Sequence, residues 1–119
     1  MTPAELEKQA AADAVAWAHE ALDLGYGEIG AALEVDERTV RRWHGREVAP
    51  RGRHRDKLEE LRELRHLLAV VFESGAEADA WLRSSVPAFR GRTPISLVRQ
   101  GRLETVIDVL ATMEAGAFL

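Results

Sequence analysis

A row of leucines between His54 and Glu73 constrains the fold of this chain more than any other feature. Its large apolar residues recur every three or four positions, at Leu58, Leu61, Leu64, Leu68 and Phe72. Residues at this spacing share one side of an α-helix. The segment is therefore predicted to be a long helix with one continuous apolar face.

The rest of the chain shows no sign of a β-strand. The β-branched residues are scattered, and no stretch alternates apolar and polar side chains for long. Further helices are predicted over Pro3 to Leu24, Glu28 to Leu33, Asp36 to Gly45, a short segment around Trp81, Thr93 to Gly101, and Arg102 to Ala115. The predicted fold class is all-α, and the stretch from Arg46 to Gly52 is a loop.

Two details of the first helix can be predicted as well. Its apolar stripe is expected to consist of Leu6, Ala10, Trp17, Ala21 and Leu22. Gly25 follows, and glycine is the usual left-handed residue that ends a helix. We therefore expect Gly25 to terminate the helix.

Charge is distributed unevenly along the chain. The net charge is −4, but the segment from Arg38 to Lys57 holds eight basic and two acidic residues, which gives it +6 and leaves −10 for the remainder. Binding to a polyanion depends on local potential rather than on net charge. The basic segment is therefore compatible with nucleic acid, although a solvated basic helix and loop would have the same composition.

The strongest local motif lies between Glu28 and Gly45 and is typical of a helix-turn-helix. Small or apolar residues stand where that motif needs them, at Ile29, Gly30, Leu33, Val35, Val40 and Trp43. Gly30 allows close approach of the two helices, and Val35 fills the turn. Glu34 occupies a turn position where glycine is common, so some strain is expected there.

The second helix of this motif is predicted to present arginines on its outer side. At about 100° per residue, Arg38, Arg41 and Arg42 lie opposite Val40 and Trp43. Arginines placed in this way contact phosphates or pair with guanine. The predicted DNA-binding residues are Glu37, Arg38, Arg41, Arg42, His44 and Arg46. The alternative is a helix-turn-helix kept only as scaffold.

Other chemistry finds little support in the sequence. The absence of cysteine excludes disulfides and thiolate metal sites. The match to G-x-G-x-x-G at residues 25–30 follows a helix rather than a strand, so we interpret it as a turn between helices. The four histidines lack a metal-ligand spacing, and no serine lies in a nucleophile motif. We expect no enzyme activity, no metal, no cofactor and no membrane segment, and a cytoplasmic location.

The C-terminal third resembles the toxin-binding domain of the Xre/MbcA/ParS antitoxins. That family has a characteristic order of tryptophan, glycine, proline and leucine residues, matched here by Trp81, Leu82, Gly91, Pro94, Leu97, Gly101, Val106, Leu110 and Gly116. Phe89 stands where leucine is usual. Ser85 and Val86 replace the family's Pro-Asn pair, and Pro87 follows. With the helix-turn-helix, the resemblance extends from about Glu28 to the end.

The resemblance implies a type II toxin–antitoxin pair. The usual toxin of this family is a RES-domain enzyme that degrades NAD, so NAD would be the toxin's substrate. The antitoxin would cover the toxin's active site, and the complex would bind operator DNA and repress its own operon. Residues 1–50 would form the DNA-binding region and residues 51–119 the toxin-binding and dimerisation region. The candidate toxin-binding residues are Arg90, Arg92, Arg99, Gly116, Ala117, Phe118 and Leu119.

Three further expectations accompany this interpretation. Phe118 and Leu119 either fold back onto the last helix or, with the terminal carboxylate, enter the toxin. Surplus apolar surface on the last helix, including Val109 and Ala111, predicts a homodimer or a toxin–antitoxin hetero-oligomer. Two alternative functions remain open: a stand-alone helix-turn-helix regulator whose C-terminal helices only dimerise, and an adaptor that uses these helices as a docking surface.

Overall fold

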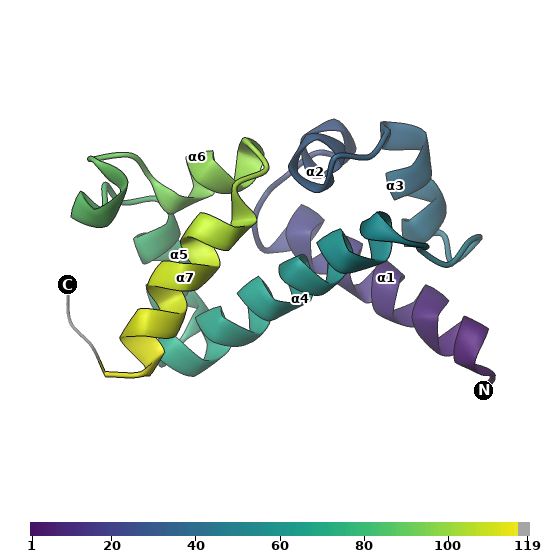
Figure 1. Ribbon diagram of the computed structural model, residues 1–119, viewed down its shortest axis with the longest axis horizontal. Helices are drawn as coiled ribbons and strands as arrows, with labels where there is room; N and C mark the ends of the chain where they lie inside the picture. Colours follow the sequence, from purple (N-terminus) through teal and green to yellow (C-terminus); the bar gives the residue numbers. More distant parts are fainter. Residues whose placement is uncertain (117–119) are drawn as a thin grey trace. The chain divides into compact units, whose positions relative to one another are not determined.

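A computed structural model describes residues 1–116 of the chain (Figure 1). Its elements are α1 (Pro3–Glu20), α2 (Tyr26–Leu33), α3 (Glu37–His44), α4 (Arg53–Val71), α5 (Gly75–Leu82), the 3-10 helix η1 (Pro87–Phe89), α6 (Pro94–Arg99) and α7 (Leu103–Glu114). Every regular element in this range is helical, which confirms the predicted all-α class. The chain divides into two compact units, Met1–Glu59 and Glu60–Leu119.

The first unit is organised around α1. Helices α2 and α3 pack against α1 and against each other (Figure 1). The buried side of α1 carries Ala11, Ala14, Val15 and Ala18, which lie on successive turns of one helix face. Because alanine side chains are short, the partner helices can approach the α1 backbone closely. The predicted stripe is wrong at both Leu6, which is 55% exposed, and Ala21, which is exposed and follows the end of α1; of its five residues only Leu22 is fully buried.

The end of α1 also differs from the prediction. The helix ends at Glu20, and the left-handed residue of the following turn is Asp23, with φ of 56°. Gly25 has φ of −72° and caps the start of α2 instead. Leu22 and Leu24 are both buried within this turn. Anchoring these two leucines in the core requires the chain to leave the helix before Gly25.

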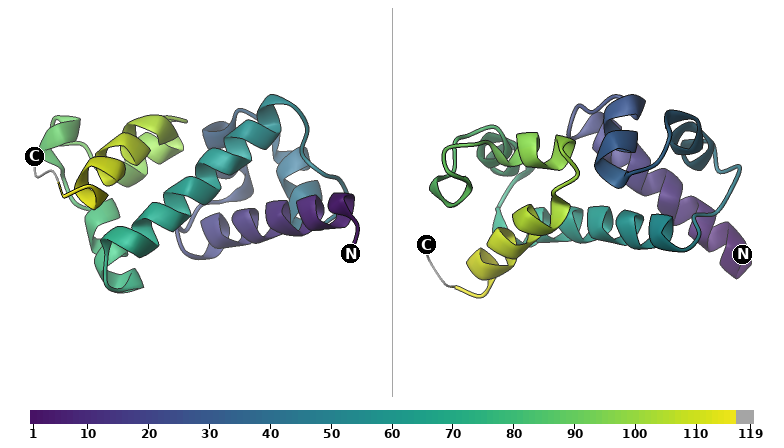
Figure 2. Two further views of the ribbon diagram at one scale, coloured as in Figure 1. Left: turned by 60° about the horizontal axis from the view of Figure 1, so that its bottom comes forward. Right: turned by 45° about the horizontal axis from the view of Figure 1, so that its top comes forward.

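The second unit contains the remainder of α4 together with α5, η1, α6 and α7, and Figure 2 shows these helices from two further directions. Helix α6 packs against both α5 and α7. The core is apolar, with Leu64, Leu97, Leu103, Val106 and Leu110 all fully buried. The four leucines of the predicted row, at positions 58, 61, 64 and 68, are buried as predicted, whereas Phe72 follows the end of α4 and is half-buried.

Three aromatic rings link the short helices of the second unit. The Trp81 ring lies 5.6 Å from the Phe72 ring and 6.3 Å from the Phe89 ring, measured between centroids. Phe89 itself is only 3% exposed. The core therefore accommodates a phenylalanine at the position where leucine is usual in the antitoxin family that the C-terminal third resembles.

Helix α4 contributes its first turns to the first unit. Leu58 is buried, the Arg55 guanidinium pairs with the Glu7 carboxylate of α1, and the His54 ring meets the Trp43 ring edge-on at 5.9 Å. The boundary between the two compact units consequently lies inside α4, between Glu59 and Glu60. The sequence predicts a boundary between two regions in the loop that precedes this helix. The assignment of separate functions to residues 1–50 and 51–119 stays a prediction.

Candidate nucleic-acid interface and partner-binding region

Helix α3 has one buried and one exposed side. Val40 and Trp43 are at most 1% exposed, whereas the arginines predicted to face outward, Arg38, Arg41 and Arg42, are exposed. The predicted orientation of the helix is therefore confirmed. Contact of these arginines with DNA stays a prediction.

The first turn of α3 is fixed by its N-cap. One oxygen of the Asp36 carboxylate accepts a hydrogen bond from the Thr39 backbone N–H at 2.7 Å. Such a bond satisfies one of the amides left unpaired at a helix start. The same contact with Thr39 lowers the pKa of Asp36 below its ordinary value of 3.8. The cap therefore holds the start of α3 at neutral pH, where this carboxylate is charged.

The turn between α2 and α3 is tight. The Val35 N–H donates to the Gly30 carbonyl oxygen at 2.9 Å, and a Cβ placed on Gly30 would lie 2.6 Å from the Val35 carbonyl oxygen. Only glycine therefore fits at position 30 without displacing backbone. Glu34 adopts the left-handed conformation, with φ of 57°, at the position where the sequence predicted strain.

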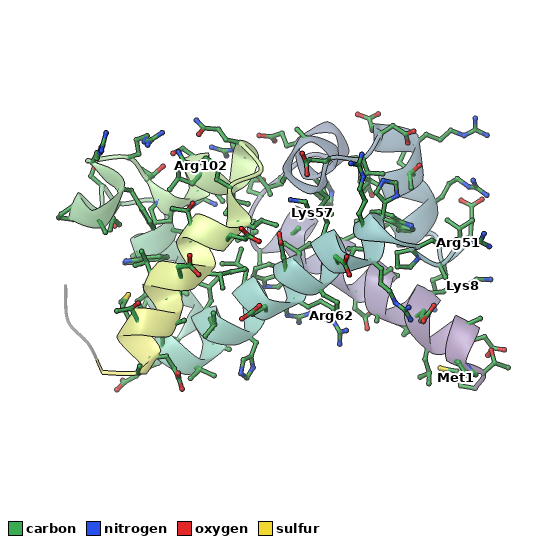
Figure 3. The ribbon with its side chains drawn as sticks, in the orientation of Figure 1. Met1, Lys8, Arg51, Lys57, Arg62 and Arg102 are labelled. Carbon is green, nitrogen blue, oxygen red and sulfur yellow. The ribbon has the colours of Figure 1, made fainter. Side chains whose placement is uncertain are left out.

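Helix α4 supports this turn through an ion pair. The Lys57 ammonium lies 3.1 Å from the Glu34 carboxylate, and Figure 3 shows Lys57 on α4. The hydrogen bond and charge of Lys57 lower the pKa of Glu34 below its ordinary value. The pair joins α4 to Glu34, the residue of the α2–α3 turn whose backbone conformation is unfavourable for a side chain.

The three outward arginines of α3 differ in their surroundings. The Arg41 guanidinium lies 3.2 Å from the Glu37 carboxylate, and its Cζ lies 4.6 Å from the centroid of the Tyr26 ring. The Arg38 and Arg42 side chains make no hydrogen bond or ion pair with residues 1–116. Arg41 is thus held by the protein, whereas Arg38 and Arg42 present their charge to solvent.

Tyr26 lies at the centre of an aromatic cluster drawn from three helices. The His19 ring of α1 stacks on the Tyr26 ring with centroids 4.8 Å apart and 6° between the planes. A hydrogen bond of 2.7 Å joins the Tyr26 hydroxyl to His44 Nδ1 of α3. Beside the cluster is a shallow, open hollow of about 320 Å³, lined by Tyr26, Arg41, His44 and Gly45.

Two other predicted DNA-binding residues lie at the C-terminal end of α3. His44 is the last residue of the helix and is half-buried by its contact with Tyr26. Arg46 follows in a left-handed conformation, with φ of 60°, and is exposed. Both lie close in sequence to the outward arginines, and Glu37 pairs with Arg41. All six residues predicted for this function therefore lie on α3 or immediately after it.

The candidate toxin-binding residues of the second unit lie in or beside a compact loop. Arg90 ends η1 in the left-handed conformation, and Arg92 Nε donates to the Phe89 carbonyl oxygen at 3.4 Å. Arg99 is the last residue of α6, and all three arginines are exposed. The segment from Arg83 to Arg102 contains five arginines and no Asp or Glu. It is therefore suited to an acidic partner surface.

The remaining candidates lie at the C-terminal end. Gly116 follows α7 with φ of 82°, a conformation that favours glycine, and so ends the last helix. Ala117, Phe118 and Leu119 lie outside the described residues. Their role stays a prediction.

Comparison with known proteins decides between the families that a helix-turn-helix could belong to. The model of the antitoxin Xre/MbcA/ParS C-terminal toxin-binding domain matches residues 67–116. The mycobacterial cidal antitoxins MbcA of Mycobacterium tuberculosis and Mycobacterium bovis are each 32% identical over 108 residues, covering 91% of this chain and 95% of the relative. The chain belongs to the Xre/MbcA/ParS antitoxin family.

A solved structure supports the same assignment. A chain in the crystal structure of the M. tuberculosis MbcT–MbcA toxin–antitoxin complex matches with a TM-score of 0.61 and 31% identity, covering 91% of this chain and 96% of that one. The match therefore extends well beyond the C-terminal domain and includes most of the first unit.

The family's sequence pattern corresponds mostly to structural positions in this chain. Leu82, Leu97, Val106 and Leu110 are buried, and Pro94 begins α6 after its Thr93 cap. These five matched residues thus have packing or helix-starting roles. This part of the Xre/MbcA/ParS pattern consequently reports the fold of the second unit.

Sequence reasoning missed Tyr26 and His19 as parts of the candidate DNA interface. The sequence predicts a turn leading into a helix that begins at Glu28, whereas α2 already begins at Tyr26, after its Gly25 cap. The signal available in the sequence was Tyr26 itself, an aromatic residue at the start of the first helix of the helix-turn-helix. Among residues 1–116, no cluster of three or more metal-ligating side chains occurs, and no helix combines the length and apolar character needed to cross a membrane.

Proposed function

We propose that this member of the antitoxin family neutralises a RES-domain toxin that degrades NAD and represses its own operon by binding operator DNA. The first unit would bind DNA through α3, and the second would cover the toxin's active site. The observation that carries the proposal is that 91% of this chain is similar to the antitoxin MbcA. The solved structure that matches this chain is a complex of MbcA with its toxin MbcT. NAD would be the toxin's substrate and not a cofactor here.

The arginine-rich loop of the second unit is the proposed site of toxin contact. Arg90, Arg92 and Arg99 are exposed there, in a segment without Asp or Glu. Arginine pairs bidentately with carboxylates, so these side chains suit an acidic surface on the toxin. Residues 116–119 would reach the same partner, with Phe118 as the apolar anchor.

Co-purification tests the toxin assignment. The chain should be co-expressed with the RES-domain protein encoded in a neighbouring reading frame, with an affinity tag on the toxin alone. Retention of the antitoxin on the resin is the expected result. A chain that binds DNA but is not retained would instead be the stand-alone regulator, with C-terminal helices that only dimerise.

Paired variants locate the contact within the second unit. Replacing Arg90, Arg92 and Arg99 by alanine should weaken retention, because three exposed cations are lost without change to the core. Phe118→Ala with Leu119→Ala tests the tail separately. The matched control is Arg38→Ala with Arg42→Ala in the first unit, which should leave toxin retention unchanged. Equal loss in all three variants would contradict the proposed location.

The DNA-binding half of the proposal rests on the exposed arginines of α3. Binding should be salt-dependent, because neutralising phosphates with arginine releases condensed counterions. Fluorescence anisotropy with the DNA upstream of the operon measures the affinity over a range of salt concentrations. Unchanged affinity after replacing Arg38, Arg41 and Arg42 together would exclude α3 as the recognition helix.

A further inference from the structure

We propose that Arg41 reads a guanine base while Arg38 and Arg42 contact phosphates, and that Tyr26 and Glu37 are the residues that position Arg41. The inference rests on the proposed DNA binding by α3 and assigns different roles to three arginines that the sequence presents as equivalent. It follows from the contacts that each arginine makes within the protein.

Arg41 is held by two supports that leave its outer end available. Glu37 Oε2 accepts from Arg41 Nε at 3.3 Å and from Nη2 at 3.2 Å. The Tyr26 ring lies beneath the guanidinium, 4.6 Å from Cζ to the ring centroid. A guanidinium has five N–H donors, and these two bonds use only two. The donors that remain lie at the Nη1–Nη2 end, which is the end that pairs with O6 and N7 of guanine.

The support beneath Arg41 is itself fixed. His19 stacks on the Tyr26 ring, and His19 Nδ1 donates to the Leu24 carbonyl oxygen at 2.8 Å. The Tyr26 hydroxyl is bonded to His44 Nδ1 at 2.7 Å. The orientation of the ring is thus determined by contacts with α1 and with the end of α3. A guanidinium supported on this ring loses less freedom when it pairs with a base.

Charge separates the arginines further. The Glu37 carboxylate compensates the Arg41 charge, so Arg41 contributes little net positive potential toward a phosphate. Arg38 and Arg42 make no ion pair with residues 1–116 and are exposed. Arg38 is close enough to the Asp36 carboxylate to contribute to its lowered pKa, but neither arginine is bonded to an acidic group of the described residues, so both present their guanidinium groups to solvent on the same side of α3. Phosphate contacts depend on net charge and determine the salt dependence, whereas base contacts depend on geometry and determine the sequence preference.

The test uses a variant that preserves net charge. Wild-type protein first selects duplexes from a random-sequence library, and affinity is then measured for the selected duplex and for a scrambled duplex over a range of salt. The variant Glu37→Ala with Arg41→Ala removes one negative and one positive charge. We expect it to lose about 5- to 150-fold of the preference for the selected duplex, while its salt slope on the scrambled duplex stays within about half a unit of wild type.

Arg38→Ala is the matched control for a phosphate contact. This variant should lower the affinity for both duplexes by the same factor and reduce the slope of affinity against salt concentration, on logarithmic scales, by about 0.9. For the positioning residue, Tyr26→Leu removes the ring and should lower the sequence preference without changing the salt slope. Tyr26→Phe keeps the ring beneath Arg41 and should retain most of the preference. Circular dichroism at the assay temperature establishes that all variants are folded.

Each alternative outcome has a defined meaning. If the charge-preserving variant keeps the full sequence preference, or if Tyr26→Phe loses as much preference as Tyr26→Leu, the role assigned to Arg41 or to the Tyr26 ring is overturned. A wild-type protein that binds all duplexes equally with a steep salt dependence overturns base reading but preserves DNA binding. A wild-type protein without salt-dependent binding to any duplex overturns the proposed DNA-binding function as well.

Discussion

Gly30→Ala should destabilise the first unit through a single backbone clash. The added Cβ would lie 2.6 Å from the Val35 carbonyl oxygen, about 0.8 Å closer than the 3.4 Å at which ordinary contact begins. The obstructing atom is backbone at the start of α3, so relief requires α2 or the turn to move. That movement also stretches the bond from the Val35 N–H to the Gly30 carbonyl oxygen.

The size of the effect follows from three contributions. Overpacking of this kind costs up to about 3 kcal/mol, and weakening the hydrogen bond costs about 1 kcal/mol more. Alanine favours a helix by about 1 kcal/mol relative to glycine, which offsets part of the loss. The expected net destabilisation is about 2–3 kcal/mol, a decrease in Tm on the order of 10 °C for a domain of this size.

Gly27→Ala is the matched control on the same helix. A Cβ at position 27 would meet only Oε1 at the end of the Glu37 side chain, at 3.0 Å, and that side chain is 52% exposed, so it can shift together with its Arg41 partner without moving any backbone. The free energy of unfolding of the Gly27→Ala variant should be unchanged or raised by up to about 1 kcal/mol. Urea denaturation followed by circular dichroism compares the two variants. Equal stability of Gly30→Ala and Gly27→Ala would refute the close contact at the turn.

Three further predictions concern helix ends, pH and assembly. Thr93→Ala should cost about 1 kcal/mol in urea denaturation, because the Thr93 hydroxyl caps α6 by accepting from the Ser96 N–H at 3.3 Å; no loss would exclude the cap. The lowered pKa of Asp36 means that its stabilising effect is present above about pH 4 and is lost as the pH falls through the folded-state pKa. Asp36→Asn keeps a capping side chain and should show a smaller loss of stability on acidification, and an unaltered acid profile would contradict this. Light scattering should give a mass above that of a monomer, and Val70→Asp should lower it because Val70 is an exposed apolar residue of α4 (49%); a monomeric wild type would refute self-association.

The sequence predicted the second unit more accurately than the first helix. The leucine row of α4 has large side chains on one side only, so its periodicity determined the buried face unambiguously. Residues 10–18 are mostly small and apolar, and several helical faces look equally buriable. The choice of the face with Ala11, Val15 and Ala18 depends on the close approach of α3 and α2, which is a tertiary effect. Local patterning does not contain that information.

The candidate DNA interface was predictable in part for a related reason. The outward placement of Arg38, Arg41 and Arg42 follows from the helical period and the positions of Val40 and Trp43. The difference between Arg41 and the other two depends on Tyr26, fifteen residues earlier in the sequence. The hydrogen bond between Tyr26 and His44 spans a similar distance along the chain. Such contacts form only when α1, α2 and α3 pack together.

Inhibition of the purified toxin tests the account most directly. The RES-domain protein from the neighbouring reading frame is incubated with NAD, and NAD consumption is followed as this chain is added. The account predicts that consumption ceases at a fixed stoichiometric ratio, and that the triple alanine variant at Arg38, Arg41 and Arg42 inhibits equally well. Undiminished NAD consumption in the presence of excess folded antitoxin would contradict the proposed function of the chain.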